Sequence, residues 1–494
     1  MNDASRNAPG ATAALAAWAA QAPRAWPDSA WRSAAHAFED TIASMVAGAG
    51  DSGTAAVRAC AFRGPVPVMG RRDGADAASA ALVNGYAAHA VEMDENFLVG
   101  LGHLCCAVLP GLLSVAHEAD LGGEAVLDAL IVASEVMARI GLAMRRAHTD
   151  RGWHGTGTIG ALAAAAGCGR LLRLDATRMG DALALAASMA AGPKIQFGTP
   201  AKPLHAGLAA QAGVVASRLA AHGLRGHVQA LEGRHGFGAL YAGVQAPDWT
   251  AIVPSAGEPL AIDAHGMAFK LWPACGATHR AIASTLALRA QHGLTPEQVR
   301  RVAVRVAYGT LVNLRYADPV DPKQAQFSMN YALALALERG TLTLADFSPA
   351  ALRDERVRAL MARITMECDP GAAEGQEDAA AHLPHRVLIE LTDGRVLEHE
   401  TRHLKGSPQD PLSAAERRQK FDMCCGGQLP PVLLGRLRAA LQVPAEIASM
   451  RSFMQTFAFE AGADDGQRFA QPPFPTSFPT SRPAAGRPEG VRPT

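Results

Sequence analysis

Two lysines stand out as residues that could carry out chemistry. The chain has 46 basic residues, but only six of them are lysines. A GC-rich coding sequence explains the preference for arginine at the average position, so the remaining lysines are informative. Lys202 and Lys270 lie among small and apolar residues, in the segments AKPLHAGLAAQAG and AFKLWPACGATH. An ammonium group in such surroundings is rarely a solvated surface charge, and its compact charge suits the binding of an anion.

Acidic residues beside a histidine form a second group of candidates. In the segment NGYAAHAVEMDEN, His89, Glu92 and Asn96 are spaced at i, i+3 and i+7, which predicts that they share one helix face. Asp94 and Glu95 are then expected to point elsewhere. A solvated acidic patch at a helix end is the alternative interpretation of this segment.

Two further histidines lie next to predicted helix starts. His103 precedes the apolar segment AVLPGLL, where a turn could direct its ring into a cavity. His154 precedes GTGTIGALAAAAG, a helix start whose free backbone N–H groups can receive an anion. The GxGxxG pattern that begins at Gly155 does not predict a dinucleotide site, because a helix precedes it where that site needs a strand. The alternative for His154 is a capping or core histidine.

Cys275 could be a nucleophile, with His279 four residues later as its base. No third group that would orient the base accompanies them, so a packing role is favoured for the thiol. The eight cysteines include no CxxC pair and no regular spacing. They are typical of reduced thiols in a cytoplasmic protein and do not predict a metal site.

The composition limits the partners of the chain. Its 46 acidic residues balance its 46 basic ones, so we expect neither nucleic acid nor an anionic membrane surface as a partner. No stretch of about 18 strongly apolar residues occurs, and therefore no membrane span is expected. These features favour a cytoplasmic metabolic enzyme.

The pattern of apolar residues predicts a mainly α protein with a smaller α+β domain. Ala and Leu recur at helical spacing from about residue 11 to 240, which indicates a large all-helical bundle domain. After residue 265, the segments VRRVAVRV, ARITMEC and HRVLIELTDGRVLEHETRHL show strand signals, the last one with a hairpin turn at Thr-Asp-Gly. We expect a helical domain at 1–265, rejoined by 406–460, an α+β lid domain at 266–405, and a disordered Pro-rich tail at 461–494.

Several separated motifs, all in the same order, resemble those of the MmgE/PrpD family, which includes 2-methylcitrate dehydratase, cis-aconitate decarboxylase and iminodisuccinate epimerase. The resemblance covers residues 28 to 455 and rests on AHAVEMDEN, AVLPGLL, GWHGTGTIGALAAAA, AKPLHAGLAAQAG, LEGRHGFG, KLWPACGATH, FSMNYALALAL and KGSPQDPLS. It implies a helical domain with an α+β lid, a homodimer, and a substrate bound between the two domains without a metal or other cofactor.

The resemblance also implies a set of site residues. The family positions carry over to Glu92, Asn96, His103, His154, Lys202, Lys270 and Tyr316. We also assign His279 to substrate binding. Three departures bear on substrate choice: Glu92 replaces the usual aspartate, Asn96 replaces a threonine, and His103-Leu104-Cys105 replaces His-Pro-Ser.

These residues suggest a division of labour. A lysine acting as a base near pH 7 would need its pKa lowered by about three units, which costs about 4 kcal/mol. Lys202 and Lys270 are therefore expected to clamp carboxylates, while His103 and His154 transfer protons and Glu92 orients an imidazole. Asn96 and Tyr316 would hold substrate oxygens.

The expected function is that of a metal-independent lyase, either a hydro-lyase or a decarboxylase, acting on a small di- or tricarboxylic acid of the 2-methylcitrate or aconitate type. Two alternatives remain open. One is a cofactor-free epimerase of an amino- or imino-dicarboxylic acid. The other is a carboxylate-binding homologue without catalytic activity.

Overall fold

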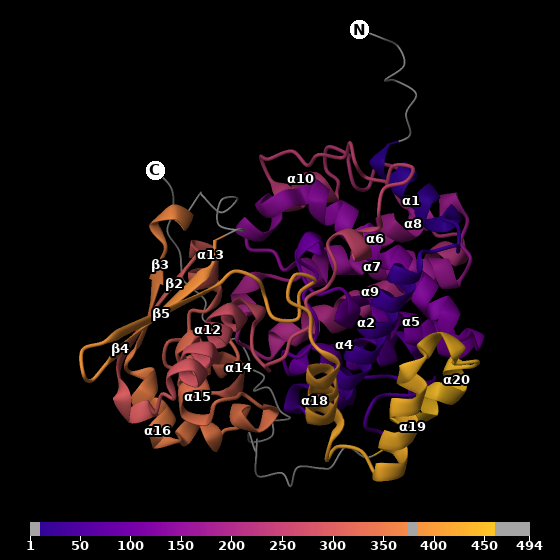
Figure 1. Cartoon of the computed structure of the whole chain (residues 1–494). Helices are drawn as coiled ribbons and strands as arrows, with labels where there is room; N and C mark the ends of the chain where they lie inside the picture. Colours follow the sequence, from indigo (N-terminus) through magenta and orange to yellow (C-terminus); the bar gives the residue numbers. More distant parts are fainter. Residues whose placement is uncertain (1–9, 374–382, 460–494) are drawn as a thin grey trace, which may run out of the picture. The chain divides into compact units, whose positions relative to one another are not determined.

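The computed structural model describes residues 10–373 and 383–459. Within these ranges the chain is mainly helical and contains one small mixed sheet (Figure 1). This confirms the predicted class, a mainly α protein with an α+β part. The predicted disordered tail, residues 461–494, lies outside the described residues.

The first part of the chain is a set of closely packed helices. Its longer helices are α1 (Ala11–Gln21), α2 (Asp28–Gly48), α3 (Ser52–Ala59), α4 (Ala77–Ala90), α5 (Cys105–Ala119), α6 (Gly123–Asp150), α7 (Gly155–Leu171), α8 (Ala176–Ala187) and α9 (Ala201–Ala221). A short strand, β1 (Arg63–Val66), and two short helices, α10 (Phe237–Ala242) and α11 (Ala261–Ala264), complete it. In this part, α6 precedes α7, so the GxGxxG pattern follows a helix as expected.

Small residues let these helices approach each other closely. A Cβ atom placed on Gly207 of α9 would come within 2.4 Å of the backbone oxygen of Leu82 on α4. On the same helix, a Cβ atom on Gly213 would come within 2.5 Å of the Cβ atom of Ala164 on α7. Side chains larger than glycine would therefore separate the helices that carry the candidate site residues.

The second part of the chain contains the sheet. Its elements are α12 (Gly276–His292), β2 (Val299–Val306), α13 (Tyr308–Asn313), α14 (Pro322–Ala325), α15 (Met329–Arg339), α16 (Glu355–Met361), β3 (Ile364–Cys368), β4 (His385–Leu391) and β5 (Val396–Thr401). The strand order is β3-β2-β4-β5. Strand β2 runs parallel to β3 and antiparallel to β4, and β4 pairs with β5 as the predicted hairpin. Helices α12 and α15 contact the sheet.

After the sheet, the chain returns to helix in α18 (Ala414–Cys425), α19 (Pro431–Gln442) and α20 (Met450–Phe453). The buried apolar residues form two clusters. One cluster contains residues from Ala11 to Met267 together with residues from Phe421 to Phe459, and the other runs from Trp272 to Leu391. The domain boundaries remain a prediction. The change from one cluster to the other between Met267 and Trp272 is consistent with them. Among the described residues, no helix combines the length and the hydrophobicity that crossing a bilayer requires.

A buried ion pair ties the N-terminal helices together and allows a stability prediction. The Arg170 guanidinium donates to both carboxylate oxygens of Asp128, at 2.9 and 3.2 Å. It also donates to the backbone oxygens of Ala20, near the end of α1, and of Ala22, just after that helix. Replacing Arg170 with methionine leaves the buried Asp128 carboxylate with only the Trp26 indole at 2.8 Å and a longer contact to Arg24 at 3.7 Å, so we expect a loss of about 3 kcal/mol in the free energy of unfolding. Urea unfolding measures this loss. The exposed Arg178→Met variant serves as the control and should change stability by no more than about 0.5 kcal/mol; equal effects in the two variants would contradict the prediction.

Candidate active site

The acidic segment after α4 differs from the sequence prediction. Helix α4 ends at Ala90, and Glu92 has a left-handed backbone with a φ of 55°. Glu92 and Asn96 therefore do not share a helix face with His89, and that prediction is wrong. The turn also brings Asp94 and Glu95, which were expected to point elsewhere, into the protein interior, with 0% and 1% of their surface exposed.

Glu92 links the two predicted lysines. Lys202, in the first turn of α9, donates to one of its carboxylate oxygens, and Lys270, in the loop before α12, donates to the other at 2.8 Å. The Nζ atom of Lys270 also lies 3.6 Å from Asp94. All four side chains are buried. One carboxylate thus bridges two ammonium groups that come from distant parts of the chain.

Each charged group in this network stabilises the ionised form of its partners. Burial by itself would raise the pKa of Glu92, but the ammonium groups of Lys202 and Lys270 outweigh it and hold that pKa below its usual range. Burial would likewise lower the pKa of Lys270, but the carboxylates of Glu92 and Asp94 outweigh it and raise that pKa. Lys270 is therefore an ammonium ion at neutral pH and is not suited to act as a base.

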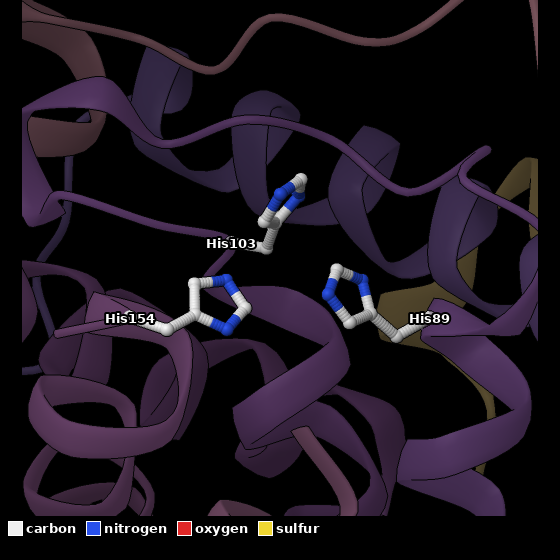
Figure 2. Close-up of side chains that lie close together, drawn as sticks. All are labelled: His89, His103 and His154. Atoms are coloured by element: carbon white, nitrogen blue, oxygen red, sulfur yellow. The ribbon is translucent and has the colours of Figure 1, made fainter. Parts of the chain in front are cut away.

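Three histidines gather beside this network (Figure 2). The ring centroids of His89 and His103 are 4.6 Å apart, and the ring of His154 lies 5.8 Å from the first and 6.2 Å from the second. Asp94 lies between two of them, because one of its carboxylate oxygens is 2.7 Å from Nδ1 of His89 and 3.1 Å from Nδ1 of His103. Nδ1 of His154 instead lies 3.1 Å from Nδ1 of His205 on α9.

The imidazoles are neutral in this environment. Burial lowers the pKa of His89 to about 3, although Asp94 opposes the shift. Burial also lowers the pKa of His103, and burial together with the Lys202 charge takes the pKa of His154 well below its ordinary value. Nδ1 of His103 donates to the backbone oxygen of Glu95 at 2.6 Å, which leaves a lone pair on Nε2. Such a ring can accept a proton.

The structure thus brings together five predicted residues: Glu92, His103, His154, Lys202 and Lys270. His89, Asp94 and His205 also belong to this group, although the sequence assigned none of them a role in the site. The motif AHAVEMDEN contained a signal for two of them, since a histidine and an aspartate five residues apart can pair wherever the chain turns between them.

Three other predicted residues lie outside this group. Tyr316 donates from its hydroxyl group to the backbone oxygen of Phe197 at 2.8 Å, so it contacts a neighbour of the His154 ring rather than the charged network. Asn96 is half-buried, and its backbone pairs with Ala268. His279 is fully buried on α12.

The thiol-nucleophile hypothesis gains no support from the geometry. The ring of His279 donates from Nε2 to the backbone oxygen of Ala274 at 3.2 Å and packs against Trp272. Burial and the carboxylate of Glu92 raise the pKa of Cys275. A partly buried thiol with a raised pKa is a weak nucleophile, so the packing role favoured from the sequence remains the better interpretation.

Glu95 gives the site a pH-dependent stability. One of its carboxylate oxygens accepts from the backbone of Leu104 and Cys105, but the other is buried and has no hydrogen-bond partner among the described residues. Burial and the charge of Asp94 raise the pKa of Glu95 from 4.5 to about 8. Folding therefore favours the protonated acid. The resulting stabilisation is complete below pH 4.5 and is lost as the pH rises to about 8.

A Glu95→Gln variant keeps the acceptor oxygen and removes this titration. We expect the Tm of the wild-type protein to fall relative to that of the variant as the pH rises through this window. Calorimetry at a series of pH values measures the difference. The exposed Glu124→Gln variant should show no such trend, and parallel Tm curves for wild type and Glu95→Gln would contradict the assignment.

Comparison with known proteins identifies two family domains and several related enzymes. The MmgE/PrpD N-terminal domain matches residues 13–250, and the MmgE/PrpD C-terminal domain matches residues 272–439. Cis-aconitate decarboxylase of Homo sapiens is 29% identical over 69% of this chain and 71% of its own length. The enzyme of the same name from Mus musculus is 30% identical over 69% of this chain and 70% of its own length.

A cis-aconitate decarboxylase-like protein of Aspergillus oryzae is 25% identical over 75% of this chain and 81% of its own length. The two domain matches together span most of the described residues. The first match contains Glu92, Lys202 and the clustered histidines, and Lys270 lies two residues before the second match. The chain therefore belongs to the MmgE/PrpD family.

Proposed function

We propose that this protein is a lyase that removes carbon dioxide from a small polycarboxylic acid of the aconitate type by proton transfer next to a carboxylate. The observation that carries the proposal is the burial of Lys202 and Lys270 around a single carboxylate, directly beside three neutral imidazoles. The names of the related decarboxylases support the choice of decarboxylation over dehydration.

In the proposed mechanism, the lysines bind substrate carboxylates. Lys270 is paired with Glu92 and lies near Asp94, so its ammonium group is held in place before substrate arrives. A substrate carboxylate that reaches Lys202 or Lys270 competes with Glu92 for the same charge. Because the site is buried, each such contact is stronger than it would be in water.

The proposed chemical step breaks the bond between a carbon atom and its carboxylate. The carboxylate leaves as carbon dioxide, and the electron pair of the broken bond moves onto the adjoining unsaturated carboxylate. The ammonium groups stabilise the negative charge that grows there. An imidazolium of His103 or His154 then delivers a proton to carbon. The negative charges of the substrate favour protonation of these imidazoles, which are neutral in the free site.

The proposal makes two further points, one about catalytic metals and one about the oligomeric state. The positive charge that the reaction needs comes from lysine, so we propose that catalysis is metal-independent. We also retain the homodimer as an expectation that comes from the family resemblance. Asn96 and Tyr316 are proposed to hold substrate oxygens at the edge of the site rather than within the charged network.

A substrate panel tests the proposal. The purified protein is incubated with 2-methylcitrate, citrate, cis- and trans-aconitate and iminodisuccinate, and mass spectrometry follows the products and the release of carbon dioxide. We expect an acid of the aconitate type to lose carbon dioxide. Loss of water from citrate or 2-methylcitrate would select the hydro-lyase, and exchange of an α-deuterium without release of a group would select the epimerase. Tight binding of an acid without conversion would contradict an enzymatic role.

A further inference from the structure

The three clustered histidines have a geometry that suits a metal ion. The candidate ligand atoms of His89, His103 and His154 all lie within 4.8 Å of one another. The rings come from three separate elements: the end of α4, the loop before α5, and the residue that precedes α7. Figure 2 shows the three rings gathered around one space. A tetrahedral zinc site places its nitrogen ligands about 3.4 Å apart, so small ring rotations complete the arrangement.

An unpartnered nitrogen points to a ligand in that space. The side chain of His89 is fully buried, and its Nε2 atom has no hydrogen-bond partner among the described residues. A buried polar atom without a partner costs stability unless another group satisfies it. In Figure 2 this ring faces the ring of His154 across the shared space.

The outer contacts of the three rings also fit metal ligation. Nδ1 of His89 donates to Asp94, and Nδ1 of His103 lies within hydrogen-bonding distance of Asp94 and of the Glu95 backbone oxygen. Nδ1 of His154 is paired with His205. Metal-binding histidines typically engage one ring nitrogen in such a contact, which fixes the ring and directs the other nitrogen to the ion.

We propose that His89, His103 and His154 bind one divalent transition-metal ion through Nε2, with Zn²⁺ as the representative ion, and that this ion inhibits the enzyme. Imidazole ligands favour such ions over Mg²⁺ or Ca²⁺, which prefer oxygen. The ion occupies the lone pairs of His103 and His154, which the proposed function needs for proton transfer. The inference therefore rests partly on the proposed function, but metal binding itself does not.

Metal binding is tested without reference to turnover. Isothermal titration of the full chain with Zn²⁺ should show one site per chain. Co²⁺ in place of Zn²⁺ should give the visible absorption of a four-coordinate ion. The His89→Gln and His154→Gln variants should each weaken binding by at least about 100-fold, because each removes a direct ligand. His117→Gln is the matched control, since His117 is also buried but lies on α5 outside the cluster, and it should bind Zn²⁺ like the wild type.

Several outcomes would overturn the proposal: no stoichiometric binding, binding that both cluster variants retain, or equal loss in the His117→Gln control. Circular dichroism of each variant shows whether it is folded, and a folded variant of either cluster residue suffices for the comparison. Zn²⁺ should also abolish turnover of the wild-type protein, and a chelator should restore it. Full activity of His154→Gln would contradict the proposed function while leaving the metal-binding result intact, so the two failures are distinguishable.

Discussion

Replacing Lys202 with methionine is expected to lower kcat/KM by about 100- to 1000-fold while the protein stays folded. The expected loss is that of one charge that stabilises the anionic transition state in a buried site. The fold should survive because Glu92 keeps its second contact, to Lys270 at 2.8 Å. The measurement is steady-state kinetics on the acid identified in the panel, together with a thermal unfolding curve.

The matched control for this prediction is Lys405→Met. The side chain of Lys405 pairs with Asp410 and Glu416 rather than with Glu92. This variant should keep wild-type kcat/KM. Similar kinetics for Lys202→Met and the wild-type protein would remove Lys202 from the mechanism. Lys270→Met is a less direct test, because it leaves both Glu92 and Asp94 short of a buried partner and so should destabilise the fold by about 3–5 kcal/mol.

Replacing His154 with glutamine is expected to lower kcat by about 100- to 10,000-fold. This is the range over which a positioned acid or base contributes to catalysis. Glutamine keeps a hydrogen-bonding side chain of similar length but does not take up a proton at neutral pH. The measurement is kcat under saturating substrate, with KM determined in parallel.

His148→Gln provides the comparison for this second prediction. His148 is also a buried histidine near α7, and its ring bonds to Thr158 at 2.8 Å. Glutamine can replace that bond, so kcat should stay close to the wild-type value. If His148→Gln and His154→Gln lose activity equally, then packing around α7 rather than proton transfer explains the effect.

The sequence was sufficient to predict most of the architecture. The alternating segment VRRVAVRV is strand β2, from Val299 to Val306, and the Thr-Asp-Gly turn joins β4 to β5. The Ala-rich segments form the helices, because their apolar periodicity is strong and local. Such patterns depend on neighbouring residues and are therefore readable in a single sequence.

Local sequence patterns do not predict where α4 ends. The segment AHAVEMDEN contains no glycine or proline that would end a helix, so helical spacing was extended to Asn96. In the structure, Glu92 leaves the helix and reaches Lys202 and Lys270, which lie 110 and 178 residues away in the chain. A contact between distant segments thus determines the local backbone, and local patterns do not contain that information.

Contacts between distant segments also explain why some predicted site residues lie in the charged network and others lie outside it. The lysines were found because few residue types replace a buried ammonium, and His154 was found because it precedes a glycine-rich helix start. His279 lies in an equally suggestive motif, but its ring turns toward the backbone of Ala274 and the face of Trp272. The direction of a side chain in a turn depends on packing that the motif alone does not specify.

Turnover in D₂O tests the central claim most directly, since that claim is that buried imidazoles beside two ammonium groups deliver a proton to a substrate carbon. NMR of the product reports where solvent deuterium enters and with which stereochemistry. The account predicts one deuteron on the protonated carbon, added to a single face, with wild-type protein, and almost no product with His154→Gln. Deuterium on both faces, or equal product from the two proteins, would mean that the proton comes from bulk water and would contradict the account.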